Sequence, residues 1–283
     1  MRKINSFVLM IALVSLGLSS CWKKYEASSY APPLNINGYT SSSQIATSNL
    51  VAHWGFNGDL KDSISSTTGV ATGTSFNQGL MGQSLQGAAN GYVESAVPTA
   101  IQNLHSFTVS VWYNMPENTN GAVEIAGIAN PQGFWSDMDI FYDNGATATT
   151  GVLKVHFFNN GLSGTGTDAW FGGYTVNNPF GGWVNVTATY DDTKSAFVVY
   201  YNGSALMTTP TVVGGFAPLN WSGVQKMIFG TFPFQANPSL TAGATSQGWA
   251  ASNTGKTDEV RFYNRVLTST EVSSLVALQY RGK

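Results

Sequence analysis

Hydrophobic and polar residues alternate along most of the chain, in short runs separated by turn residues. Residues 107–112 and 184–190 alternate in this way and are rich in β-branched and aromatic side chains, which is typical of half-buried strands. Residues 196–201 run directly into Asn202 and Gly203, the dipeptide that most strongly indicates a two-residue hairpin turn. The pattern predicts about a dozen strands joined by tight turns.

One helix is expected, near the C-terminus. Thr268 can cap its first turn while the side chain of Glu271 reaches back to the cap, which is the reciprocal pattern of a capping box. An apolar stripe accompanies it, formed by Leu267, Val272, Leu275, Val276 and Leu278. Many strands with no helices between them favour two packed antiparallel sheets. We therefore expect an all-β sandwich with a short C-terminal helix.

The apolar run nearest the N-terminus has a different character. Arg2 and Lys3 precede an uncharged apolar stretch over residues 7–18, which is shorter than the about 20 residues that a membrane-spanning helix needs. Its length and its basic flank are typical of a signal-peptide core. The stretch leads into Leu-Ser-Ser and then Cys21, which resembles a bacterial lipobox. Residues 1–20 are therefore predicted to be a lipoprotein signal peptide and Cys21 the lipidated residue; an ordinary signal peptide with a chance cysteine is the alternative.

The composition agrees with an exported, lipid-anchored protein. Cys21 is the only cysteine among 283 residues, so the chain can form no internal disulfide and depends on an apolar core. A net charge of −2 provides no basic surface for nucleic acid. We expect a protein of the bacterial cell envelope, in the outer membrane, that meets the membrane only through its lipid. Lys23 and Lys24 leave open whether it faces the exterior or the periplasm.

Residues 21–48 resemble a spacer more than a folded segment. They mix Ser, Thr, Ala, Asn and Pro with no usable periodicity, so they offer little apolar area to bury. This composition predicts a lipidated, flexible tether. The remaining residues, 49–283, have a normal length for a single sandwich domain.

Six short blocks of sequence stand out within that domain. They lie at residues 50–63, 79–85, 91–93, 106–112, 182–191 and 258–267. In this order they resemble the laminin G-like jelly rolls of the concanavalin A-like class, especially the bacterial LamG-like modules. The resemblance implies a concanavalin A-like jelly-roll β-sandwich. Residues 115–178 and 208–255 depart from the family pattern, so the binding loops of the family cannot be carried over.

The same resemblance implies a structural calcium ion between the first and last strands. Asp258 would supply a carboxylate, with Asn57 and Asp62 facing it and backbone carbonyls near Gly58 completing an oxygen shell. The alternative is that Asp62 caps a turn and Asp258 accepts hydrogen bonds from backbone amides. Histidine-based metal sites are not expected. The three histidines stand alone, each in or beside a predicted strand: His53, His105 and His156.

Three acids raise the question of catalysis. Asp137, Asp139 and Asp143 alternate with other residues, so a strand would place them on one face. They imitate a Glu-x-Asp-x-x-Glu strand of some concanavalin A-like glycosidases, but all three are aspartates. A retaining glycosidase needs carboxyls about 5–5.5 Å apart, and residues two apart on a strand are separated by roughly 6.6 Å. The alternative is an exposed strand face that leads into a turn.

Aromatic side chains are the usual binding groups for sugars. An apolar C–H face of a sugar ring stacks on Trp or Tyr, while neighbours such as Asp168 and Asn177 can take hydroxyls. Trp54, Trp112 and Trp183 fall in the family blocks and are expected in the core. The candidates for carbohydrate binding lie in the divergent segments: Trp135, Trp170, Tyr174, Trp221 and Trp249. The alternative is that these rings pack under their own loops.

Three functions remain open from the sequence. We favour a membrane-anchored, non-catalytic module that binds a glycan or polysaccharide through loop aromatics. The first alternative is an interaction or adhesion module of the cell envelope with protein partners, which predicts loop tryptophans that are buried or scattered. The second is a glycoside hydrolase, which predicts two carboxylates facing each other in a cleft. A groove shared by the loop tryptophans would favour sugar binding.

Overall fold

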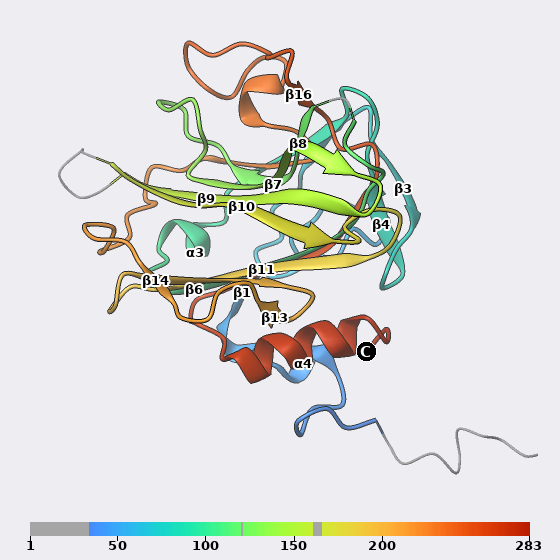
Figure 1. Cartoon of the computed structure of the whole chain (residues 1–283), viewed down its shortest axis with the longest axis vertical. Coiled ribbons are helices and arrows are strands. Elements are labelled where there is room, and N and C mark those ends of the chain that lie inside the picture. The colour runs from blue at the N-terminus through green and yellow to red at the C-terminus, as the bar shows by residue number, and fades with distance from the viewer. Residues whose placement is uncertain (1–33, 120, 161–165) are drawn as a thin grey trace, which may run out of the picture. The chain divides into compact units, whose positions relative to one another are not determined.

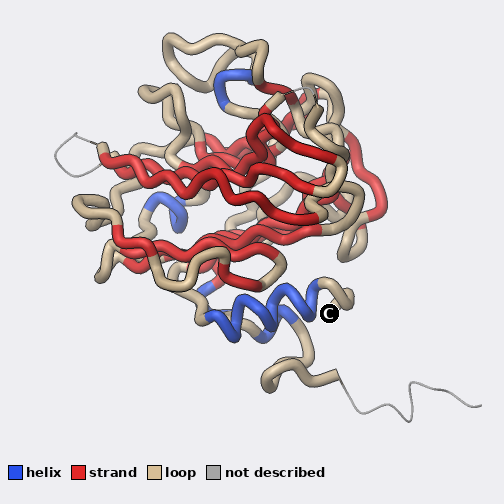
Figure 2. The backbone as a smooth tube through the Cα atoms, viewed as in Figure 1, coloured by secondary structure: helices blue, strands red, loops and turns tan. Residues whose placement is uncertain are grey.

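The alternating segments form the strands of two stacked sheets. The computed structural model describes residues 34–119, 121–160 and 166–283, and residues 35–283 form one compact unit. Figure 2 shows the strands as two layers, with the short helix α3 (Thr99–Gln102) between them and a longer helix outside one layer. The predicted all-β sandwich with a C-terminal helix is confirmed. No helix of the described residues is long and apolar enough to cross a membrane.

The first sheet brings the two ends of the domain together. Its strands are β1 (Leu50–Trp54), β3 (Ser75–Gln78), β4 (Gln83–Gln86), β6 (Phe107–Asn114), β11 (Val184–Asp191), β12 (Ala196–Tyr201), β13 (Ser204–Ala205), β14 (Thr211–Val212) and β17 (Lys256–Tyr263). Among the described residues this nine-stranded sheet has the order β13-β12-β11-β6-β17-β4-β3, with β1 paired to β17 and β14 to β12. The last strand therefore lies inside the sheet, in contact with the first.

The second sheet contains most of the divergent sequence. Its strands are β2 (Val70–Thr72), β5 (Tyr92–Ala96), β7 (Ala122–Ile128), β8 (Met138–Thr147), β9 (Thr150–Asn159), β10 (Thr167–Asn177), β15 (Lys226–Phe229) and β16 (Ala250–Ala251). Within the described chain this eight-stranded sheet has the order β10-β9-β8-β7-β15-β5-β2, and β16 pairs in parallel with β7. β8, β9 and β10 are long neighbours in an antiparallel meander (Figure 1).

The core fills the space between the sheets. Because side chains alternate along a strand, Phe107, Val109 and Val111 of β6 point inward, where they are fully buried. Aromatic rings join the two layers: Phe157 of β9 stacks on Phe197 of β12, with ring centroids 5.3 Å apart. Burial of this apolar surface is the main stabilising contribution to such a sandwich.

Helix α4 (Ser269–Gln279) covers the outer face of the nine-stranded sheet (Figure 1). The predicted capping box is present: the hydroxyl of Thr268 accepts from the Glu271 amide at 3.2 Å, and the Glu271 carboxylate accepts from the Thr268 amide at 2.9 Å. The guanidinium of Arg265 donates to both carboxylate oxygens of Glu271. These contacts hold the start of the helix against the end of β17.

The N-terminal segment of the compact unit corrects one prediction. Ser41 and Gln44 form a capping box around the 3-10 turn η1 (Ser42–Gln44), and Ile45 is buried beside it. The amide of Ser42 donates to the carbonyl of Lys283 at 3.1 Å, so the segment lies against the C-terminus. The prediction of a flexible tether is therefore wrong for residues 35–48, where local caps and one apolar anchor stabilise structure. The signal peptide, Cys21 and residues 22–33 lie outside the described residues.

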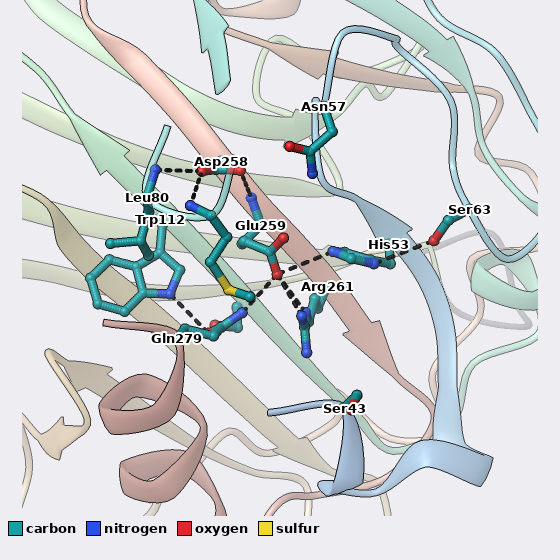
Figure 3. Close-up of polar contacts among 12 residues, drawn as sticks. Ser43, His53, Asn57, Ser63, Leu80, Trp112, Asp258, Glu259, Arg261 and Gln279 are labelled. Carbon is teal, nitrogen blue, oxygen red and sulfur yellow. Dashed lines mark hydrogen bonds and ion pairs between the residues drawn. The ribbon is translucent and has the colours of Figure 1, made fainter. Parts of the chain in front are cut away.

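A buried ionic network connects β1, β17 and α4 (Figure 3). One carboxylate oxygen of Glu259 lies 3.2 Å from His53 Nε2 and accepts from Arg261 Nε at 3.0 Å. The amide of Gln279 donates to the same oxygen at 3.0 Å, and its carbonyl accepts from the indole of Trp112 at 2.9 Å. Burial alone would raise the pKa of Glu259, but His53 and Arg261 lower it to about 2. Three segments of the chain thus depend on one carboxylate.

Replacing Glu259 by Ala should lower the free energy of unfolding by about 3–5 kcal/mol, because Arg261 would stay buried without its counter-charge. Lys194→Ala, which breaks an exposed ion pair with Asp191, is the control and should cost no more than about 1 kcal/mol. Urea unfolding of both variants measures the difference. Equal losses in the two variants would contradict this role of Glu259.

The same ion pair predicts a pH dependence of stability. Since the pKa of Glu259 falls from an ordinary value of 4.5 to about 2 on folding, the folded protein binds fewer protons than the unfolded protein between these values. The contribution of Glu259 is complete above pH 4.5 and is lost as the pH falls toward 2. The stability advantage of the wild type over Glu259→Ala should therefore shrink in this window, as measured by urea unfolding at each pH.

Candidate functional site

The outer face of the eight-stranded sheet, directed away from the nine-stranded sheet, carries an unusual set of side chains. Ile140 and Tyr142 of β8 point into the core, so Asp139 and Phe141 point outward. Asp139 pairs with His156 of β9, and His156 pairs with Trp170 of β10. We call Asp139, His156 and Trp170 the Trp170 row.

Aromatic rings from separate segments gather over this face. Trp135 contacts Trp170 edge to face, with centroids 5.0 Å apart, and lies 5.9 Å from Trp249. Phe134 stacks on Phe234 at 4.5 Å. The segment that precedes β16, which includes Phe234, lies over β7 and β8 (Figure 1). We call the following rings the aromatic cluster: Phe134, Trp135, Phe141, Trp170, Phe232, Phe234 and Trp249.

Three rings of the aromatic cluster are open to solvent. Trp170 is 41% exposed, and Phe134 and Trp249 are each 37% exposed. Trp135 is half-buried and lies within contact distance of all three. A group of partly exposed aromatic rings on one sheet face is a candidate surface for a ligand with an apolar face.

Beneath Trp170 lies a buried histidine between two carboxylates. His156 stacks on the Trp170 ring at 3.9 Å, its Nδ1 lies 2.8 Å from Asp139 Oδ2, and its Nε2 lies 2.9 Å from Asp168 Oδ1. Burial by itself lowers the pKa of His156. The hydrogen bonds and charges of Asp139 and Asp168 have the opposite and larger effect, so the pKa lies above its ordinary value. Both ring nitrogens can then donate, one to each carboxylate. Asp168 keeps more than half of its side chain exposed.

A second buried acid lies next to Asp139. Burial raises the pKa of Glu124 well above its usual range, and the neighbouring Asp139 adds to the rise. Glu124 comes from β7, where Gly127 pairs with Asp139. A side chain at position 127 would collide with the Glu124 carboxyl, so glycine makes room for it. Hydrogen bonds connect Asp139 through His156 to Asp168, and the carboxyl of Glu124 lies next to Asp139 at the buried end of this chain.

A polar pocket of about 250 Å³ lies beside Asp137, the residue directly before the first residue of β8. Asp137 is almost completely buried, and its carboxylate accepts from Asn130 at 3.2 Å and from Asn160 at 3.3 Å. Burial raises the pKa of Asp137 to about 7, although the Asn160 hydrogen bond opposes this, and Asp139 adds to the rise. The pocket is lined by Asn130, Pro131, Gln132, Asp137, Asn160, Asn220, Ser222 and Gly223.

The three acids of the glycosidase hypothesis have different surroundings. Asp139 is fully buried, and one of its carboxylate oxygens is bonded to His156 and to the Ser136 amide. Asp143 forms an ion pair with Lys154 at 2.5 Å. Of the three, Asp137 alone lines the pocket beside β8. A retaining pair needs two carboxyls at one sugar, and this face presents no such pair among these aspartates.

The aromatic predictions have mixed outcomes. Trp135, Trp170 and Trp249, predicted as binding residues, do lie together in the aromatic cluster. The prediction for Trp221 is wrong: the residue is fully buried in the core, stacks on Phe107 at 5.0 Å, and donates from its indole to a backbone carbonyl. A tryptophan in a glycine-rich stretch therefore serves the core here.

Tyr174 is also misplaced by the sequence pattern. The pairing of β10 with β9 shifts between Phe171 and Tyr174, because one extra residue enters β10 at Gly172 and Gly173. Gly173 has a φ of +73°, which glycine adopts at little cost. The bulge turns Tyr174 back toward the core, against which it packs. It therefore does not join Trp170, and the prediction that the two form one surface is wrong.

Sequence reasoning missed Phe134 and Glu124. Phe134 contributes an exposed ring next to Trp135, and Glu124 places a second buried carboxyl next to Asp139. His156 was expected to stand alone, and its pairing with Asp139 was not foreseen. The two neighbouring alternating segments were the available signal, since the hairpin that they form brings Asp139 opposite His156; Asp143, Asn144 and Gly145 lie inside β8, where the pairing shifts, and the chain turns at residues 148 and 149.

The predicted calcium ligands bind backbone amides instead. Asp62 accepts from the amides of His53 at 2.7 Å, Ile64 at 3.1 Å and Ser65 at 2.9 Å. This is the turn-capping arrangement that the sequence left as the alternative. No group of three His, Cys, Asp or Glu residues suited to a metal ion occurs among the described residues.

Asp258 and Asn57 hold the turn between β3 and β4. Asp258 accepts from the amides of Leu80 at 2.8 Å and Met81 at 3.2 Å, as Figure 3 shows for Leu80. Asn57 accepts from the amide of Gln83 at 2.8 Å. Side chains at the turn's two glycines, Gly79 and Gly82, would collide with Asp258 and Asn57 respectively. The three proposed ligands therefore do not fit a calcium site as they are arranged, because N–H groups already point at their oxygens.

The two stacked, mostly antiparallel sheets form a jelly roll of the concanavalin A-like class. The model of the concanavalin A-like lectin/glucanases superfamily called Laminin_G_3 matches residues 86–273, more than half of the chain. The chain belongs to this family. The family fold occurs in both glycosidases and non-catalytic lectin domains. No curated protein sequence matches the chain.

Solved structures share this fold at low sequence identity. Domain 4 of AbnA, an extracellular arabinanase from Geobacillus stearothermophilus solved with arabinotriose, is 20% identical with a TM-score of 0.50, over 81% of this chain and 98% of that one. A Trypanosoma rangeli sialidase mutant is 17% identical with a TM-score of 0.55, over 82% and 33%. Botulinum neurotoxin type C, described with two ganglioside molecules, is 15% identical with a TM-score of 0.57, over 84% and 53%. The chain thus spans about a third of the sialidase and half of the toxin chain.

Removal of calcium should not destabilise the protein, because backbone amides already satisfy Asp62 and Asp258. Thermal unfolding in EGTA and in excess calcium should give the same midpoint. Magnesium at the same concentration controls for ionic strength. A midpoint that falls in EGTA and recovers with calcium, but not with magnesium, would show that a calcium site exists.

Proposed function

We propose that the protein binds carbohydrate without cleaving it, on the aromatic cluster of the eight-stranded sheet. The observation that carries this proposal is the gathering of three partly exposed rings, Phe134, Trp170 and Trp249, in one cluster on one sheet face. The C–H faces of sugar rings stack on such surfaces, and the exposed carboxylate of Asp168 can accept hydroxyl protons. Clustering, rather than scattering, of the tryptophans favours sugar binding over the alternative of a protein-interaction module.

Trp170 is held in place before any ligand arrives. His156 stacks under its ring and Trp135 contacts it edge to face. Asp139 and Asp168 fix the orientation of His156 from both sides. A ring held in this way loses little conformational entropy on binding, so more of the stacking energy is available for affinity.

Solved structures of the same fold are consistent with this proposal. The AbnA domain was solved with arabinotriose, and the toxin is described with ganglioside molecules. Another toxin binding domain was solved with rat synaptotagmin II, a protein partner, so fold alone does not choose between ligands. The aromatic cluster supports the choice of a glycan. The buried state of Asp139 argues against the glycosidase alternative.

Trp170→Ala should weaken glycan binding by about 2 kcal/mol, or roughly thirtyfold, because it removes an exposed stacking ring near the centre of the cluster. Titration calorimetry against a panel of soluble polysaccharides measures the change. Tyr280→Ala is the matched control, because Tyr280 is an exposed aromatic residue at the end of α4 on the opposite side of the sandwich. Absence of binding to any glycan by a folded wild-type protein would refute the proposed function.

We also propose that the chain is a lipoprotein attached to the bacterial cell envelope through Cys21, most simply in the outer membrane. The apolar run, the basic start and the lipobox-like segment support this placement. A lipid on Cys21 would attach the folded unit, which begins at Asn35, to the bilayer by a short stretch of chain. A surface-attached module of this kind would hold bound polysaccharide at the cell envelope.

Cys21→Ala should move the protein from the membrane fraction to the soluble fraction, because no other cysteine can be lipidated. Ser20→Ala keeps a small residue before the cysteine and serves as the control, which should remain with the membranes. Fractionation followed by detergent extraction measures the distribution. If the Cys21→Ala variant sediments with membranes like the wild type, the anchor assignment is wrong.

A further inference from the structure

The polar pocket lies next to the aromatic cluster on the same sheet face. The amide of Phe158 donates to the carbonyl of Asp137 at 2.9 Å, and Phe158 pairs with Asp168 across β9 and β10. Asp137, Phe158 and Asp168 therefore form a row next to the Trp170 row. Successive same-face residues on a strand are roughly 6.6 Å apart. Asp137 also lies two strands away from Trp170, at about 4.8 Å per strand, so the backbones of Asp137 and Trp170 are roughly 12 Å apart on one sheet face, a distance that an oligosaccharide can span.

The pocket has the size and the chemistry to bind sugar hydroxyls. Its volume of about 250 Å³ is just below the roughly 300–1,000 Å³ of typical small-molecule sites, which suits one sugar ring. Asn130, Asn160 and Gln132 bring amide groups that donate and accept, and Ser222 adds a hydroxyl. Asp137 is held by two of these amides, so its carboxylate is oriented before a ligand enters.

The charges around the two rows are mostly negative. Asp137 and Asp168 face the region of the pocket and Trp170, with Asp139 buried between them. His156 already lies between two carboxylates, and Lys154 is paired with Asp143. The described residues that line the pocket include no Lys or Arg. Since the pKa of Asp137 is about 7, this acid is mostly ionised above neutral pH. An anionic ligand would then meet like charge with no Lys or Arg in the pocket to compensate, which costs binding energy.

We propose that the pocket beside Asp137 is a second sugar subsite, which binds a further unit of the glycan whose one ring stacks on Trp170, and that the acids of this face restrict the ligand to neutral glycans. Glycans rich in uronic acid, sialic acid or sulfate are then poor ligands. This inference rests on the proposed function of the aromatic cluster and adds the length and charge class of the ligand. A bound glycan spans at least two sugar units.

The pocket can be blocked without disturbing the fold. Gly223 lines it, and a Cβ built there meets no atom within 4 Å, with the backbone outside the left-handed region. Gly223→Trp should therefore fill the pocket and weaken binding of di- and longer oligosaccharides at least about tenfold, with an unchanged melting midpoint. Gly182→Trp is the matched control, at an equally open glycine just before β11 of the other sheet, and should bind like the wild type.

The charge class is tested with matched polymers. Each neutral polysaccharide that binds is compared with an acidic counterpart, for example a methyl-esterified and a de-esterified galacturonan, by calorimetry at fixed salt. We expect the neutral form to bind at least about tenfold more tightly. Asp137→Asn should narrow this difference, whereas Asp191→Asn, which removes the same charge from the nine-stranded sheet, should not.

The outcomes separate the two proposals. If no glycan binds, both the proposed function and this inference fail. If glycans bind with loss in Trp170→Ala, but acidic forms bind as tightly as neutral ones, the charge restriction is wrong and the proposed function stands. If Gly223→Trp binds like the wild type while remaining folded, the pocket is not a subsite. Neutral selectivity together with loss in Gly223→Trp supports the inference.

Discussion

The buried carboxylate of Glu259 is the interaction on which the rest of the structure depends. It receives His53 from the first strand, Arg261 from its own strand and Gln279 from the C-terminal helix. Its neighbour Asp258 holds the turn before β4 through two amides. Since β17 lies inside the nine-stranded sheet, these two adjacent acids connect β1, the turn before β4 and helix α4 to the same strand. Backbone amides donate to the carboxylates of Asp62 and Asp258, which were predicted to bind calcium.

These contacts lie in the nine-stranded sheet, so the sequence of the eight-stranded sheet can differ from the family pattern without disturbing them. The family blocks supply β1, β6, β11 and β17 of the nine-stranded sheet, whereas the divergent residues 115–178 build β7 to β10 of the other sheet. Because side chains alternate along a strand, every second residue of β7 to β10 packs in the core between the sheets, and the others point away from it. The aromatic cluster and the Asp137 pocket lie on this outer face, and loops of the second divergent segment, residues 208–255, complete both. This is where a family fold can acquire its own specificity.

The sequence was sufficient for the fold and insufficient for the details of the site. Alternation, the Thr268 capping box and the six blocks predict features that depend on local pattern, and these are present. Trp221 and Tyr174 fail because their direction depends on long-range packing and on a bulge, which period-2 reasoning cannot see. Asp258 fails as a calcium ligand because the number of backbone amides around a carboxylate is a tertiary property. The folded segment at residues 35–48 was missed because its order comes from contacts with the distant C-terminus.

The buried polar residues of the Trp170 row, Asp139 and His156, lower the stability of the fold through desolvation, which indicates that they serve another purpose. Placing His156 and Asp139 out of water is unfavourable unless each charge is paired, and here His156 lies between the carboxylates of Asp139 and Asp168. An apolar set of residues could fill the same space with less desolvation. What the charged row adds is a fixed direction for His156, and therefore a fixed plane for the tryptophan stacked on it. Rigidity of an exposed ring has no value to the core, but it lowers the entropic cost of binding a ligand.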